Sequence, residues 1–245
     1  MHKGKVALIT GGGTGIGRAV ALGLATQGVN TVLNYSRSET EAAETAELVR
    51  AGGAACHLHA ANVADDRAVR AMIASVVERL GRLDFLVNAA GVTDFVALTD
   101  LEGLKEEYWD RTLAVNVKGV FFVCRAAAPH LKQARGSIVN ISSIAGLTGR
   151  GSSIAYSASK AAVIAMTKSL AQALAPEVRV NSVAPGPVMT RWQAGREEAV
   201  TKLALGAPLA KVCGPEDVAA VVVPLLLSAG LVTGQTVVVD GGMVM

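Results

Sequence analysis

The feature that most constrains the fold of this chain is a glycine-rich turn between an apolar run and a helical pattern. Residues 5–10 read KVALIT, a short apolar run typical of a buried parallel strand. The segment 11–17 (GGGTGIG) follows at once, and apolar residues then recur at helical spacing through Leu24. Such glycines let the backbone approach a pyrophosphate, while the helix N-terminus offers unpaired N–H groups. The segment therefore predicts a dinucleotide-binding unit, the alternative being a glycine-rich loop that occurs by chance.

The same alternation of apolar runs and helical patterns continues along the chain. Six further strands are predicted, at 31–35, 55–60, 84–88, 137–142, 178–184 and 236–240. The chain has 245 residues, of which 51% are hydrophobic and only 4% aromatic, which suits one domain with a core of small branched side chains. We expect an α/β Rossmann-type fold over residues 1–245, a doubly wound parallel seven-stranded sheet with helices on both faces.

Composition excludes several other classes of function. The net charge of +3 is too small to indicate a nucleic-acid partner, and the apolar run 221–227 is too short to span a membrane and is expected to be a buried helix. Three widely separated cysteines, with no signal peptide predicted, fit a cytoplasmic protein. His57 and His59 share a strand face, but no third ligand follows, so no metal site is predicted.

The end of the second strand bears on the type of cofactor. An NAD-type site usually carries a carboxylate there, which binds the ribose 2′-hydroxyl. Here the strand ends with Tyr35, Ser36 and Arg37, which offer hydroxyls and a guanidinium suited to a 2′-phosphate. NADP(H) is therefore the preferred cofactor, with NAD(H) as an alternative, unless Arg37 is simply a solvated loop residue.

A candidate reaction centre lies in the second half of the chain. Tyr156 and Lys160 stand four residues apart, so on a helix their side chains share one face. A lysine ammonium nearby is expected to lower the pKa of the phenol towards the range useful for acid–base catalysis. Ser143 adds a hydroxyl to the same site. A Tyr–Lys pair at this spacing is also common on exposed helices, and that alternative stays open on spacing alone.

Several motifs in order resemble the short-chain dehydrogenase/reductase family. Thr10, Gly11, Gly15 and Gly17 match its T-G-x-x-x-G-x-G pattern. The matching segments that follow are Asn62-Val63, Asn88-Ala89-Ala90-Gly91, Leu113 to Gly119 with Asn116, Ser142 to Gly146, Tyr156 to Lys160, and Pro185 to Thr190. Two departures from the family pattern are Ala89 in place of a second Asn and Thr14 where NADP-preferring relatives often carry a basic residue.

The resemblance implies an enzyme that transfers a hydride between nicotinamide and a carbonyl or secondary alcohol. Its catalytic residues would be Asn116, which holds a water and kinks a long helix at 106–133, with Ser143, Tyr156 and Lys160. Val188 and Thr190 would hold the nicotinamide carboxamide. The full set of expected cofactor residues is Gly11, Gly13, Thr14, Gly15, Ile16, Gly17, Tyr35, Ser36, Arg37, Asn62, Val63, Asn88, Ala89, Ala90, Gly91, Tyr156, Lys160, Pro185, Gly186, Val188 and Thr190.

Within that family the chain looks most like 3-oxoacyl-acyl-carrier-protein reductases. The shared features are the NYSRS strand end, the N-V-x-D segment and the short Gly-Gly-Met ending. This implies reduction of 3-oxoacyl thioesters on an acidic carrier protein, with basic residues at the site entrance. The candidates are Lys132, Arg135, Arg150, Arg191 and Arg196. The carrier-binding arginine often found in such reductases is absent, because 175–177 reads Ala-Pro-Glu.

Other interpretations of the same pattern remain. It also resembles dehydrogenases of sugars, steroids and other small alcohols or ketones, and some proteins of this fold bind the dinucleotide only as regulators. We further expect a nucleotide-binding half at about 1–92, a catalytic half at about 93–245 and a mobile lid at about 188–210, since residues 192–206 carry no strong pattern. Similar proteins form homotetramers, and the last strand is expected to end the sheet at an edge that can pair.

Overall fold

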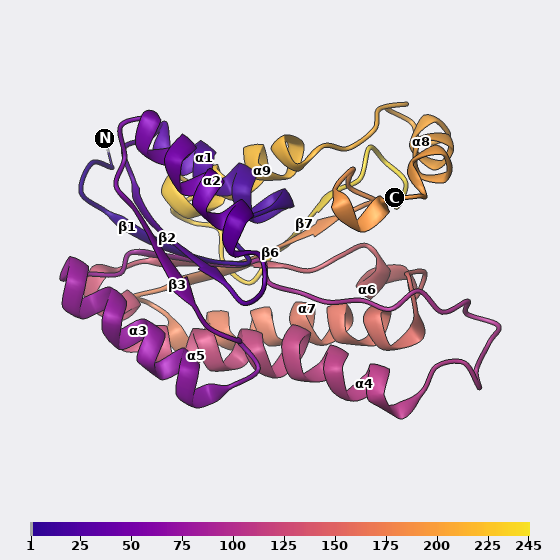
Figure 1. The fold of residues 1–245 in the computed structure, drawn as a ribbon, viewed down its shortest axis with the longest axis horizontal. Helices are drawn as coiled ribbons and strands as arrows, with labels where there is room; N and C mark the ends of the chain where they lie inside the picture. Colours follow the sequence, from indigo (N-terminus) through magenta and orange to yellow (C-terminus); the bar gives the residue numbers. More distant parts are fainter. Residues whose placement is uncertain (1) are drawn as a thin grey trace.

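Seven parallel strands form one sheet in the structure, a computed structural model that describes residues 2–245. They lie in the order β3-β2-β1-β4-β5-β6-β7 (Figure 1). Their bounds are β1 (Val6–Thr10), β2 (Asn30–Tyr35), β3 (Cys56–Ala60), β4 (Phe85–Asn88), β5 (Ser137–Ile141), β6 (Arg179–Pro185) and β7 (Thr236–Val239). The predicted fold class and all seven strands are confirmed. The strand order reverses between β1 and β4, the position where open α/β sheets bind ligands.

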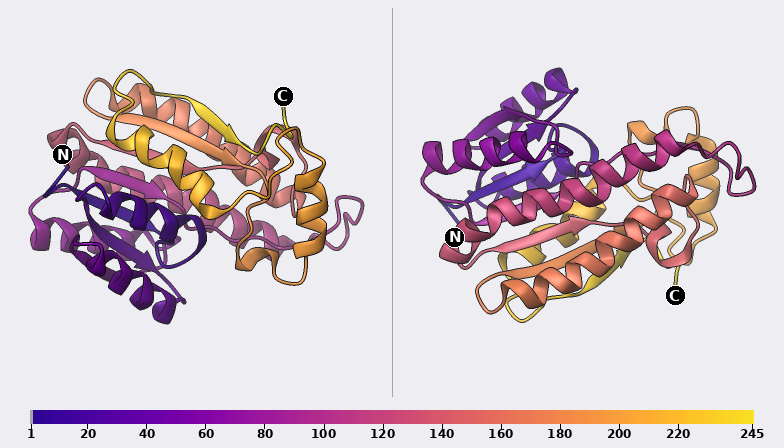
Figure 2. Two further views of the ribbon diagram at one scale, coloured as in Figure 1. Left: turned by 90° about the horizontal axis from the view of Figure 1, so that it is seen from above. Right: turned by 90° about the horizontal axis from the view of Figure 1, so that it is seen from below.

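Helices cover both faces of the sheet, as Figures 1 and 2 show. One face carries α1 (Gly15–Ala25), α2 (Glu39–Ala51) and α9 (Pro215–Leu227). The other carries α3 (Asp66–Leu80), α4 (Glu106–Leu113), α5 (Val120–Ala134) and α7 (Ile154–Leu174). The short helices α6 (Ala145–Thr148) and α8 (Glu197–Leu205) lie beside the site described below.

The apolar strand β1 is buried on both faces. Ala7 and Ile9 pack in the core beneath α1 and α9, while Val6 and Leu8 pack in the core beneath α3 and α5. A strand with two buried faces has no polar side to alternate with, which explains the continuous apolar run in the sequence. The residues of β1 therefore hold the glycine turn at a fixed place at the carboxyl edge of the sheet.

The helix predicted over 106–133 is continuous but contains a π-helical segment, η1 (Ala114–Gly119), between α4 and α5. The segment surrounds Asn116, where the family resemblance implied a kink. Pro129 neither ends nor shortens the helix, since α5 continues to Ala134. A π-helical turn inside a long helix is frequent at functional sites.

The segment 192–206 is more regular than the sequence led us to expect. It contains a 3₁₀ turn, η2 (Arg191–Gln193), and the whole of α8. Val200 and Ala204 are buried four residues apart, and Glu197 and Glu198 stand in the first turn where acidic groups favour a helix. The sequence interpretation missed this pattern because the buried face is only two residues long.

The apolar run at 221–227 is confirmed as part of the buried helix α9, with Val222, Leu225 and Leu226 in the core. Among residues 2–245, no helix has both the length and the apolar character that a membrane crossing requires.

Candidate active site

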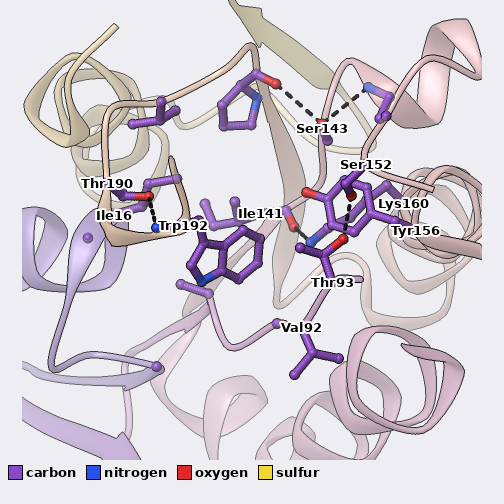
Figure 3. Close-up of a pocket in the computed structure, with 18 of the residues that line it drawn as sticks. Ile16, Val92, Thr93, Ile141, Ser143, Ser152, Tyr156, Lys160, Thr190 and Trp192 are labelled. Atoms are coloured by element: carbon purple, nitrogen blue, oxygen red, sulfur yellow. Dashed lines mark hydrogen bonds between the residues drawn. The ribbon is translucent and has the colours of Figure 1, made fainter. Parts of the chain in front are cut away.

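A cavity of about 1620 Å³ lies at the carboxyl ends of the strands. It runs from the glycine turn at one end to Tyr156 and Lys160 at the other, and Figure 3 shows its central part. The predicted cofactor residues that line it are Gly11, Thr14, Gly15, Ile16, Gly17, Tyr35, Ser36, Arg37, Asn62, Val63, Ala89, Ala90, Gly91, Tyr156, Lys160, Pro185, Gly186, Val188 and Thr190. The structure therefore brings together residues from nearly the whole length of the chain.

The glycine turn depends on the absence of side chains at two positions. Gly11 has φ +64°, and a Cβ there would lie 2.9 Å from the backbone of Ala90. A Cβ at Gly17 would lie 2.3 Å from the carbonyl oxygen of Gly11. Thr10 Oγ1 accepts hydrogen bonds from the amides of Ala89 and Ala90, each at 3.2 Å, and so joins the two turns. Helix α1 begins at Gly15 and directs its free N–H groups to the cavity, which fits a pyrophosphate.

Two residues predicted to bind the cofactor lie outside the cavity wall. A Cβ on Gly13 would lie 2.9 Å from Ala42, and the Gly13 carbonyl accepts a hydrogen bond from Thr45 Oγ1 at 2.9 Å, so Gly13 packs against α2. Asn88 is buried in β4 and donates to Asn140 Oδ1 at 2.9 Å. This corrects the predicted role of Gly13 and Asn88, since both serve packing beneath the site.

The loop after β2 forms another part of the cavity wall, on the side of the glycine turn. Arg37 is exposed, and it forms no ion pair with any residue of the described chain. The two nearby carboxylates are engaged elsewhere: Glu39 accepts from the Tyr35 hydroxyl at 3.1 Å, and Glu41 pairs with Arg191 at 2.8 Å. The Arg37 guanidinium is therefore available to an anionic ligand.

Helix α7 places Tyr156 and Lys160 on the cavity wall. The helix begins after Ser153, whose hydroxyl accepts a hydrogen bond from the Tyr156 amide at 3.2 Å. Lys160 Nζ donates to the carbonyl oxygen of Ile141 at 2.9 Å and lies 5.6 Å from the centroid of the Tyr156 ring. Figure 3 shows the two side chains together at the carboxyl end of β5. The face-sharing predicted from their spacing is confirmed.

The serine beside them is Ser143, as predicted. Its hydroxyl accepts from the amide of Ala145 at 3.1 Å and donates to the carbonyl oxygen of Pro185 at 3.5 Å. It also lies near enough to the Tyr156 phenol to act on its pKa. Ser142 points the other way, with its hydroxyl 2.6 Å from that of Ser182 and donating to the Val183 carbonyl at 3.0 Å. Ser142 therefore fastens β5 to β6, and Ser143 faces the cavity.

The acid–base properties of the pair differ from the sequence expectation. Desolvation raises the pKa of Tyr156 to about 12, although the nearby Ser143 hydroxyl acts to lower it. Desolvation also lowers the pKa of Lys160 to about 8. The expected lowering of the phenol's pKa by the ammonium is thus wrong for the protein alone, because burial is the largest influence on the phenol. At neutral pH the phenol is protonated, the form that can give a proton to a carbonyl oxygen.

Asn116 lies behind the cavity wall and is not part of it. Its Nδ2 donates to the carbonyl of Val92 and to Ser159 Oγ, both at 3.0 Å, and its Oδ1 accepts from the Val92 amide at 2.9 Å. Ser159 Oγ in turn donates to the Tyr156 carbonyl at 2.7 Å. Both donors of the amide are used within the protein, so its side chain does not donate to the water that was expected there. Asn116 is a positioning residue that ties Val92 to α7.

The opposite wall is formed by the segment after β6. Thr190 Oγ1 accepts from the Trp192 amide at 3.4 Å, and the Thr190 methyl group would lie 3.3 Å from a Cβ on Gly15. Trp192 stands edge-on to Tyr156, with the ring centroids 6.4 Å apart and the planes at 74°. Sequence reasoning did not single out Trp192, because a lone tryptophan after a turn carries no readable pattern.

Basic and apolar side chains share the mouth of the cavity. Arg150, Arg191 and Arg196 line it as expected, together with Phe95 and the partly exposed leucines Leu98 and Leu203. Lys132 and Arg135 do not. They end α5 just before β5 begins, so they lie at the amino edge of the sheet, opposite the cavity. Their predicted position at the entrance is therefore wrong.

Within residues 2–245 no group of three or more His, Cys, Asp or Glu side chains is arranged to hold a metal ion. Burial on β3 lowers the pKa values of His57 and His59.

Comparison with known proteins places this site in a large group of enzymes. A family model described as enoyl-(acyl carrier protein) reductase matches residues 11–244. The 3-oxoacyl-[acyl-carrier-protein] reductase FabG of Staphylococcus aureus is 41% identical, and the match covers all of both chains. The FabG reductase of Thermotoga maritima is 39% identical over 99% of this chain and 98% of its own.

Comparison with solved structures agrees with these sequence matches. A crystal structure from Burkholderia xenovorans, whose name places it among short-chain dehydrogenase/reductases, matches with a TM-score of 0.92 at 35% identity. The match covers 98% of this chain and 97% of the other. The glycine turn and the residues Ser143, Tyr156 and Lys160 line one cavity. The chain belongs to the short-chain dehydrogenase/reductase family and is an oxidoreductase that acts on carbonyl or hydroxyl groups with a nicotinamide dinucleotide.

Proposed function

We propose that the protein is an NADP(H)-dependent reductase of 3-oxoacyl thioesters. The observation that carries the proposal is that one cavity connects Ser143, Tyr156 and Lys160 to the glycine turn and to Arg37, whose guanidinium forms no ion pair in the described chain. The relatives named above act on 3-oxoacyl groups carried by an acyl carrier protein, as their names state. The reductive direction also suits a phenol that is protonated at neutral pH.

The residues of the site divide the work as follows. The bound dinucleotide supplies the hydride that reduces the carbonyl carbon. Tyr156 gives its proton to the carbonyl oxygen, and Ser143 donates a hydrogen bond that stabilises the charge developing there. Lys160 lies where its ammonium can donate hydrogen bonds to ribose hydroxyls. Its positive charge can also stabilise the phenolate that remains once Tyr156 has given up its proton. The amide network of Asn116 and Ser159 keeps α7 at a fixed distance from the turn at Gly91.

Preference for NADP(H) follows from Arg37. A guanidinium without an ion-pair partner suits a 2′-phosphate, whereas residues 34–38 at the end of β2 include no carboxylate to bind a 2′-hydroxyl. The hydroxyls of Tyr35 and Ser36 lie along the same wall.

The mouth of the cavity supports an acyl thioester that is carried on an acidic protein. Phe95 and Leu203 offer an apolar path for an acyl chain, and Arg150 and Arg196 form no ion pair within the described chain. Such unpaired positive charges attract an acidic carrier over a distance set by the salt concentration. Residues 188–210, which include α8, are proposed as the lid over this mouth, and the three free thiols fit a cytoplasmic protein.

The substrate class is tested by NADPH oxidation. We expect acetoacetyl thioesters to be reduced readily, and simple ketones far more slowly. In the reverse direction, sugars and secondary alcohols should support little reduction of NADP⁺. If thioester reduction is undetectable while a sugar or steroid turns over, the acyl interpretation is wrong and a general dehydrogenase remains.

The proposed interaction with an acyl carrier protein is tested by varying the salt concentration and by substituting an arginine at the mouth of the cavity. Raising the ionic strength should slow reduction of carrier-bound substrate more than that of a small thioester, because only the carrier uses long-range attraction. Arg150→Ala should show the same selectivity, whereas Lys132→Ala, at the opposite edge, should change neither rate. Equal effects on both substrates would contradict a carrier-docking role.

We also propose a homotetramer with two-fold symmetry. Leu113 and Phe121 on the α4–α5 surface expose 37% and 39% of their area, and β7 is an unpaired edge of the sheet. Light scattering at micromolar concentration should report four chains, and Phe121→Glu should reduce that number by placing charge in the interface. A wild-type monomer would contradict this proposal.

A further inference from the structure

The side chain of Trp192 enters the centre of the cavity. A Cβ on Gly91 would lie 3.5 Å from the ring carbon Cη2 of Trp192 and 3.8 Å from Lys160 Nζ. The indole also stands edge-on to Tyr156. Figure 3 shows it between Ile16 and Thr190 on one side and the Tyr156–Lys160 pair on the other. Trp192 therefore lies beside the turn at Gly91 and the phenol of Tyr156, and the same turn borders Lys160 Nζ.

The strap that carries this side chain, Thr190–Arg196, is fastened on both sides of the cavity. On the nucleotide side, Arg191 pairs with Glu41 in the first turn of α2 at 2.8 Å, and Thr190 packs on Gly15. On the substrate side, the Arg196 guanidinium lies 4.2 Å from the centroid of the Phe95 ring. The indole thus projects into the cavity from a strap that contacts α2 and Gly15 on one side and Phe95 on the other.

A ligand that runs from the glycine turn to Tyr156 has to pass the same place. The cavity wall there is formed by Gly91 and Lys160, and the indole stands against that wall. If Lys160 holds a ribose as proposed, then the ribose and the indole need the same space. Two groups cannot occupy one volume in a close-packed site.

We propose that Trp192 is a gate that the dinucleotide displaces when it binds. The strap yields at its exposed ion pair, the indole leaves Gly91 and Tyr156, and the riboside end of the cofactor takes its place beside Lys160. Part of the binding free energy is spent on breaking the contacts of the indole, so the native side chain weakens cofactor binding. This inference rests on the proposed cofactor site but not on the identity of the carbonyl substrate.

A gate and a fixed wall predict opposite changes in cofactor affinity when the Trp192 side chain is removed. If Trp192 were a fixed wall that packs against the bound cofactor, removing it would weaken binding. If it is a gate, removing it strengthens binding, because the ligand no longer breaks an aromatic contact. An edge-to-face pair of this kind corresponds to about twofold to tenfold in affinity.

The first experiment measures the Kd of NADP⁺ by calorimetry, without turnover, for the wild type and Trp192→Ala. We expect the variant to bind about twofold to tenfold more tightly. Trp109→Phe, at a partly buried tryptophan of α4 away from the cavity, should leave the Kd unchanged. Unchanged or weaker binding by Trp192→Ala, with its melting temperature preserved, overturns the gate.

The second experiment does not depend on removing the gate. In the Trp109→Phe protein, Trp192 is the only tryptophan, since the chain contains two. Trp192 already exposes 39% of its area. Saturating NADP⁺ should increase the quenching of its fluorescence by acrylamide further, because the displaced indole loses its contacts with Gly91 and Tyr156. Reduced or unchanged quenching means that the indole stays in place, and the gate is wrong even if Trp192→Ala does not fold. If the wild type binds neither NADP⁺ nor NAD⁺, the proposed cofactor site itself fails, which is a different result from a wild type that binds NADP⁺ without displacing Trp192.

Discussion

Tyr156→Phe is expected to lower the turnover number for thioester reduction by about 10² to 10⁴, the usual contribution of a positioned general acid. Phenylalanine keeps the ring and its edge-on contact with Trp192, so the cavity keeps its shape. It removes only the hydroxyl that would protonate the carbonyl oxygen. The Kd of NADPH should change by less than about twofold, because the cofactor is held mainly by other residues.

The matched control is Tyr108→Phe. Tyr108 lies in α4, away from the cavity wall, so the loss of its hydroxyl should leave turnover unchanged. Stopped-flow absorbance would separate hydride transfer from cofactor binding in both variants. Tyr156→Phe activity close to the wild type would rule out Tyr156 as the acid.

Arg37→Ala is expected to weaken NADPH binding by roughly tenfold to a hundredfold and to spare NADH. The exposed guanidinium has no partner in the described chain, and a hydrogen bond to a charged group contributes about 1.5–3 kcal/mol. NADH lacks the 2′-phosphate, so it loses nothing when the charge is removed. The ratio of the two kcat/KM values measures this selectivity directly.

Arg67→Ala provides the control for charge alone. Arg67 is another exposed arginine, on the first turn of α3, and it does not line the cavity. Its removal should leave both cofactors unaffected. Equal weakening of NADPH and NADH by Arg37→Ala would instead mean that Arg37 supports the loop after β2 and does not select the cofactor.

The fold was predictable because strong local patterns agree with the overall architecture. β1 is buried on both faces and therefore reads as an unbroken apolar run. Glycine is required at positions 11 and 17 because a Cβ there would lie less than 3 Å from neighbouring backbone atoms. The spacing of Tyr156 and Lys160 fixes a shared helix face wherever the helix lies. These features depend on residues close together in the chain, so the sequence alone reveals them.

What escaped prediction depends on contacts between distant segments. Gly13 belongs to the glycine motif but packs on Ala42, and no sequence pattern tells one glycine of the turn from the next. Lys132 and Arg135 carry the expected charge but lie at the amino edge of the sheet, because α5 ends there just before β5 begins. The sequence interpretation weighed their charge and not their place before a strand.

The pKa of Tyr156 was misjudged for a related reason. The ammonium of Lys160 was visible in the sequence, but the desolvation that raises the pKa to about 12 comes from the surrounding walls.

The central claim is that a hydride passes from the dinucleotide to the carbonyl carbon of a 3-oxoacyl thioester while Tyr156 supplies the proton. Mass spectrometry of the product made with NADPH deuterated at C4 of the nicotinamide, on the face that is transferred, tests it most directly. Fragmentation of the product should locate one deuterium at C3 of a 3-hydroxyacyl thioester. With the label in the solvent instead, C3 should carry none, and deuterium should be found only at C2, whose acidic hydrogens exchange in the 3-oxoacyl substrate. A product of the 3-oxoacyl thioester without deuterium at C3 would contradict the claim. So would an enzyme that transfers deuterium to an enoyl thioester and not to the 3-oxoacyl thioester.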